Sequence, residues 1–156
     1  MKDAPKAAVG SRLKRPALIA AGLLVGVGLL HWLCVFDRRQ GKALEQLGAE
    51  VRRDWTRLGR PIIVVYLPGD VFNPLGKPIS EDDVIHELKG LVDLRKLYLW
   101  GWSVITDKTL SHLPELGLSQ LRLLDIQLTG ISGDGLKYVK ELPALQELWL
   151  SGTRGA

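Results

Sequence analysis

Few side chains in this chain of 156 residues have the chemistry and spacing of a catalytic or metal-binding site. The histidines are His31, His86 and His112. His31 lies within a long apolar run, whereas His86 and His112 fall in segments with helical spacing, where we expect them to be solvated or near a helix end. The chain contains no Gly-x-Ser-x-Gly motif that could hold a nucleophilic serine. The histidines therefore predict neither a catalytic triad nor a metal site.

The acidic residues that could form a carboxylate pair stand at predicted helix starts. Asp82-Asp83 and Asp107 could support acid–base chemistry. Carboxylates in the first turn of a helix also have a structural role, because they interact favourably with the helix dipole. The segment 130–135 lacks the Lys and Ser/Thr of a phosphate loop, and the oxygen spacing of a calcium loop is missing. Cys34, the single cysteine, offers no disulfide or zinc spacing. We therefore predict no catalytic residue, no cofactor and no metal, and expect that the protein is not an enzyme.

The elements that would position any site follow from a recurring leucine pattern. The motif Leu94-x-x-Leu97-x-Leu99 occurs twice more, as Leu121-x-x-Leu124-x-Ile126 and as Leu145-x-x-Leu148-x-Leu150. The copies are separated by 27 and 24 residues. Alternate residues of a strand point to one face, so each triplet predicts a short strand with a buried face. Such a strand needs stacked neighbours to bury its leucines, and the steps fall in the range of leucine-rich repeats.

A turn and a short helix are predicted between the strands. Ser80, Thr106 and Ser132 are good helix N-caps, each followed by an apolar helical pattern. The apolar, mostly β-branched run 62–67 predicts the strand of a degenerate first unit, and a Pro/Gly/Asn-rich insertion at 70–77 follows it.

These motifs resemble the leucine-rich repeats that are abundant in planctomycete bacteria, with their L-x-x-L-x-L-x-x-T-x-I-T-D-x-G-L unit, over residues 44–156. The segment 47–63 resembles the entry segment of that family, which implies a helix through Leu47, a strand near Val51 and a cover for the first edge of the sheet. An amphipathic helix lying on a membrane surface is the alternative for this segment. Trp102-Ser103 and Gly133 depart from the repeat pattern.

The residue between the two inward leucines of each strand points outward. This column is Tyr66, Tyr98, Asp125 and Trp149, and Trp100 stands beside it in a flanking column. Aromatic residues are enriched at the energetic centres of protein interfaces, so the five residues predict a protein-binding face. The alternative is that outward aromatics only stabilise the sheet by cross-strand pairing.

Charge is unevenly distributed along the chain. The formal net charge of +4 equals that of residues 1–16, where five Lys/Arg outnumber Asp3. Residues 61–156 carry −3 and residues 37–60 carry +3. We therefore expect no nucleic-acid partner.

Residues 17–36 contain no Asp, Glu, Lys or Arg and are long enough to cross a bilayer as a helix. We expect a retained transmembrane helix; a cleaved signal peptide and a buried core helix are the alternatives. The cations before the span favour a single-pass membrane protein with its C-terminal part outside the cytoplasm. Gly22-x-x-x-Gly26 could support a homodimer.

The sequence thus predicts an α/β protein, a short leucine-rich-repeat solenoid preceded by one transmembrane helix. Its parts are a basic tail at 1–16, the span at 17–36, a linker and N-terminal cap at 37–60, and repeats at 61–156. The expected function is a membrane-anchored, non-catalytic protein-binding module, with self-assembly at the membrane as the alternative. Leu145, Leu148 and Leu150 are expected to be partly exposed, so that this edge is frayed or is covered by a second copy or a partner.

Overall fold

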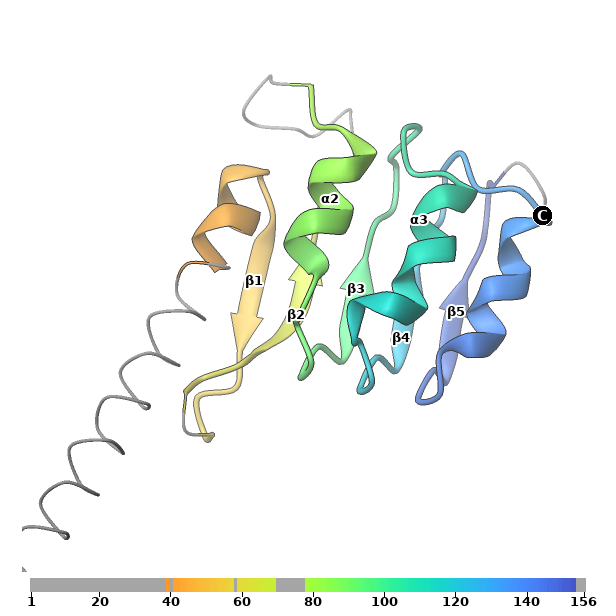
Figure 1. Cartoon of the computed structure of the whole chain (residues 1–156). Helices are drawn as coiled ribbons and strands as arrows, with labels where there is room; N and C mark the ends of the chain where they lie inside the picture. The colour runs from red at the N-terminus through yellow and green to blue at the C-terminus, as the bar shows by residue number, and fades with distance from the viewer. Residues whose placement is uncertain (1–38, 40, 58, 70–77, 154–156) are drawn as a thin grey trace, which may run out of the picture.

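The computed structural model describes residues 39, 41–57, 59–69 and 78–153. These residues form a five-stranded sheet whose strands are ordered β1-β2-β3-β4-β5 (Figure 1). The strands are short: Glu50–Arg53 (β1), Ile62–Tyr66 (β2), Lys96–Tyr98 (β3), Leu123–Asp125 (β4) and Glu147–Trp149 (β5). The helices that follow the strands are Glu81–Leu88 (α2), Asp107–His112 (α3), and the 3₁₀ helices Leu113–Leu116 (η2) and Gly135–Glu141 (η3).

The predicted fold class requires correction. The described residues form a small α/β domain with a mixed sheet, because β1 runs antiparallel to β2 whereas β2 to β5 are parallel. This arrangement does not support the predicted class of a leucine-rich-repeat solenoid preceded by a transmembrane helix. Within the described ranges, no helix is long and apolar enough to cross a membrane. The expected span at 17–36, with Gly22, Gly26, His31 and Cys34, lies outside the described residues.

The leucine pattern does predict the positions and register of the parallel strands. Leu97 pairs with Leu124 and Leu124 pairs with Leu148, so the sequence steps of the pattern match the strand register. The inward leucines of β3 and β4 have no exposed surface, whereas Leu145, Leu148 and Leu150 are only partly buried. The expected partial exposure of the β5 leucines is therefore confirmed.

The helices lie on one face of the sheet and cover its buried leucines (Figure 1). Ser80 begins α2 with a full capping box, in which it accepts a hydrogen bond from the Asp83 backbone N–H and Asp83 accepts from Ser80. Thr106 caps α3 in a similar way through the Lys108 N–H. The short helix expected after Ser132 is a 3₁₀ helix, consistent with the low helix propensity of Gly133 and Gly135.

The segment before β1 forms the predicted cover of the first edge. Residues 41–46 are helical, and β1 contains Val51. Leu44 is 1% exposed and belongs to the same core as the sheet leucines. Because β1 forms hydrogen bonds with β2, the edge of β2 that faces away from β3 is not left open. The packing of Leu44 contradicts the alternative of a helix lying on a membrane surface.

Candidate functional site

The five predicted site residues lie together on the sheet face opposite the helices. Tyr66 pairs in register with Tyr98, Tyr98 with Asp125, and Asp125 with Trp149, so one row crosses the four parallel strands. Trp100 follows β3 and donates a hydrogen bond from its Nε1 to the Tyr66 hydroxyl at 2.6 Å. We call Tyr66, Tyr98, Trp100, Asp125 and Trp149 the aromatic face.

The rings of the aromatic face contact one another in series. The Tyr66 and Tyr98 centroids are 5.6 Å apart with planes tilted by 47°, and Trp100 meets Tyr66 edge to face at 6.3 Å. Trp149 meets Tyr98 edge to face at 6.3 Å. These are the geometries that aromatic pairs prefer, so each ring restrains its neighbour.

Asp125 lies beneath two of these rings. Tyr98 and Trp149 are two strands apart, which separates their backbones by about 9–10 Å, yet their ring centroids are only 6.3 Å apart. The rings therefore lean toward each other over the strand between them. Asp125, the residue paired with both, is 4% exposed, and its Oδ1 accepts a hydrogen bond from the Gln127 N–H at 3.1 Å. The burial of this carboxylate is not evident from the sequence.

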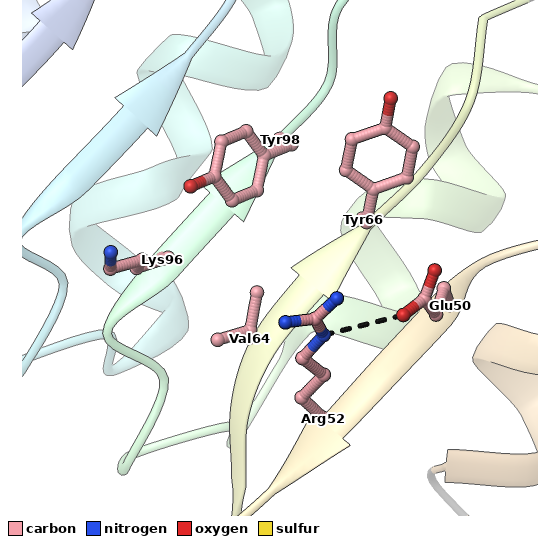
Figure 2. Close-up of a pocket in the computed structure, with 6 residues that line it drawn as sticks. All are labelled: Glu50, Arg52, Val64, Tyr66, Lys96 and Tyr98. Carbon is pink, nitrogen blue, oxygen red and sulfur yellow. Dashed lines mark hydrogen bonds and ion pairs between the residues drawn. The ribbon is translucent and has the colours of Figure 1, made fainter.

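Two shallow hollows border the row of rings. The first has a volume of about 620 Å³ and lies between β1, β2 and β3 (Figure 2). Its walls are Tyr66 and Tyr98 together with Glu50, Arg52, Val64 and Lys96. The second has a volume of about 280 Å³, and the whole aromatic face lines it, with Gln127 and Leu128.

The first hollow includes residues that sequence reasoning missed. Glu50 pairs in register with Tyr66, and Arg52 pairs with Val64, so both point to the aromatic side. Arg52 donates to the Glu50 carboxylate at 3.3 Å (Figure 2). The alternation Glu-Val-Arg at 50–52 indicates a strand with Val51 facing the core and its two charged neighbours facing away. The sequence does not give the direction and register of this strand, so it could not place the two charged residues beside Tyr66 and Val64.

Trp102 does not extend the aromatic face. It is 1% exposed and donates from its Nε1 to the Leu67 carbonyl oxygen at 3.1 Å. The indole therefore belongs to the hydrophobic core.

The helix-start carboxylates hold neighbouring helices together. Glu81 accepts hydrogen bonds from the backbone N–H and the hydroxyl of both Thr106 and Thr109, at 2.7 to 3.0 Å. Asp107 accepts in the same way from the N–H and hydroxyl of Ser132. Asp82 accepts from Lys108, and this hydrogen bond raises the pKa of the Lys108 ammonium. These carboxylates therefore have structural partners.

The described part of the chain contains no group of three or more His, Cys, Asp or Glu that could hold a metal ion. His86 is exposed on α2, and His112 is half-buried at the end of α3. The arrangement of the aromatic face suits binding through apolar surface, ring faces and one buried carboxyl group.

Comparison with known proteins does not assign the chain to a family. No protein-family model, curated protein or solved structure matches it. The comparisons therefore give no support to the leucine-rich-repeat assignment that the residue pattern suggested.

Proposed function

We propose that the protein binds another protein through the aromatic face and catalyses no reaction there. The observation that carries this proposal is a row of mutually restrained aromatic rings on the sheet face that no described helix covers. Rigid aromatic side chains give contact area at a low cost in side-chain entropy, and they are enriched among residues that dominate binding energy.

Two further features favour binding over a purely cross-strand role for the rings. Trp149 is 44% exposed. A ring that only stabilised the sheet would be expected to be more deeply buried. The rings also border two shallow hollows of about 620 and 280 Å³. Concave apolar surface with a few polar groups is typical of binding sites.

The test is affinity capture with variants of the full-length chain. Tyr98→Ala combined with Trp149→Ala should remove the specific partner, since each hot-spot truncation costs about 2 kcal/mol or more of binding energy. Trp55→Ala is the matched control, because Trp55 is 70% exposed but lies in the β1–β2 connection, where Arg60 stacks on its ring. Circular dichroism should show that each variant remains folded.

Four outcomes decide the proposal. Loss of one partner in the double variant and its retention in Trp55→Ala support it. Equal capture by both variants contradicts it, and so does a double variant that is unfolded under all conditions. Recovery of only the chain itself would instead favour the alternative function of self-assembly.

A further inference from the structure

The second hollow differs from the first because a buried carboxylate lines it. Asp125 is 4% exposed, and it lines the hollow together with the rings of Tyr98 and Trp149. The second hollow thus combines aromatic walls with a carboxylate that can accept hydrogen bonds.

The described residues use only part of the hydrogen-bonding capacity of the Asp125 carboxylate. Its Oδ1 accepts one hydrogen bond, from the Gln127 N–H. Among the ion pairs formed by the described residues, none involves Asp125. Lys96, the nearest cation along the neighbouring strand, pairs in register with Leu123 and not with Asp125. An ionised carboxylate can accept about four hydrogen bonds, so Asp125 retains capacity for a further donor.

The surrounding rings select the kind of donor. Tyrosine and tryptophan faces attract cations, tryptophan most strongly. A guanidinium can stack flat on an aromatic face and also donate two parallel hydrogen bonds to a carboxylate. Ring faces and a buried carboxylate around one hollow of about 280 Å³ match both properties of that group.

We propose that the second hollow binds the guanidinium of an arginine side chain that the protein partner presents. The identity of the occupant as a partner side chain rests on the proposed function. Trp149 and Tyr98 would hold the planar cation by stacking, and the Asp125 carboxylate would accept its N–H groups. The guanidinium N–H groups would use the acceptor capacity that the described residues leave on the Asp125 carboxylate.

The test uses two small probes on the full-length ¹⁵N-labelled chain, followed by NMR titration. The first probe is N-acetyl-arginine-N′-methylamide, and the second is the corresponding citrulline compound, which keeps the shape but lacks the charge. The arginine probe should shift the resonances of Asp125, Gln127 and the Trp149 indole, and should bind about tenfold more tightly than the citrulline probe.

Two variants, each of which removes one carboxylate, distinguish a specific role of Asp125 in binding from a general effect of net charge. Asp125→Asn keeps an oxygen that can accept from the Gln127 N–H, and should weaken binding of the arginine probe about tenfold. Glu147→Gln removes an exposed carboxylate from the same strand as Trp149, and should leave binding within twofold of the parent.

Equal binding of the two probes, no shift at these resonances, or an Asp125→Asn variant with unchanged affinity would overturn the arginine site. None of these results would affect partner capture by the aromatic face, which the Tyr98 and Trp149 variants test separately. Conversely, a working arginine site in a chain that captures no partner would refute the proposed function alone.

Discussion

At the residue scale, two carboxylates at helix starts differ in their surroundings from the carboxylate of Asp125. Glu81 and Asp107 satisfy the N–H groups and hydroxyls at the start of the next helix. Asp125 accepts one hydrogen bond from the described residues and lies beside aromatic rings. The two helix-start carboxylates explain how the fold is held, whereas Asp125 belongs to the surface that we propose binds a partner.

Glu81→Ala should destabilise the domain by about 1–3 kcal/mol, because it leaves the donors of Thr106 and Thr109 without their acceptor. Urea unfolding of the full-length chain measures the change. Glu87→Ala is the control on the same helix, and its effect should stay within about 0.5 kcal/mol. Equal losses in the two variants would show that the hydrogen bonds to Glu81 contribute nothing specific.

Glu81 should also make stability depend on pH. Burial alone raises the pKa of this carboxyl, but hydrogen bonds from Thr109 and Thr106 outweigh burial and hold the pKa below the ordinary value of 4.5. Ionised Glu81 therefore stabilises the fold above about pH 4.5, and this contribution is lost as the pH falls through the folded-state pKa. Thermal unfolding between pH 3 and 7 should show a flatter acid limb for Glu81→Gln than for Glu87→Gln. Identical limbs would contradict the assignment.

At the scale of elements, the leucine spacing was sufficient to place the strands but not to define the fold. An alternating pattern specifies which face of a strand is buried, so β3, β4 and β5 fall where expected. It carries no information on strand direction, so the antiparallel β1 and the mixed sheet were not predicted. The pattern also could not show that Trp102 is buried, because its hydrogen-bond partner, the Leu67 carbonyl, is 35 residues away in the sequence.

The shared position of the five candidate residues could be predicted for the same reason as the positions of the strands. Its members occupy equivalent outward positions of strands that pair in register. The sequence could not show that Tyr98 and Trp149 lean together over Asp125, because that contact depends on side-chain packing across two strands. It also could not show that Glu50 and Arg52 of β1 complete the first hollow.

Equivalent inward leucines should differ in their contribution to stability. Leu124 of β4 is completely buried between two strands, so Leu124→Ala should cost about 2–5 kcal/mol. Leu148 is its register partner in β5 and is only partly buried, so Leu148→Ala should cost clearly less. Denaturant midpoints at constant m-value compare the two. A larger loss at Leu148 would contradict the described packing.

At the scale of the whole molecule, helices cover one face of the sheet (Figure 1). The opposite face carries the row of rings. This division gives the domain a structural side and a side available for contact. The Glu50–Arg52 pair and Lys96 lie at one hollow, and Asp125 at the other, so charge varies along the aromatic side. Such variation would fix the orientation of a partner rather than supply most of its affinity.

The central claim is that a protein partner contacts the aromatic face. Site-specific photo-crosslinking tests it most directly, with a benzophenone side chain at Gln127, which lines the second hollow, or at Glu115, which is exposed on η2. We expect a crosslinked adduct with one partner protein from position 127 and none from position 115. Adducts of equal yield from both positions, or an adduct from position 115 alone, would contradict the claim.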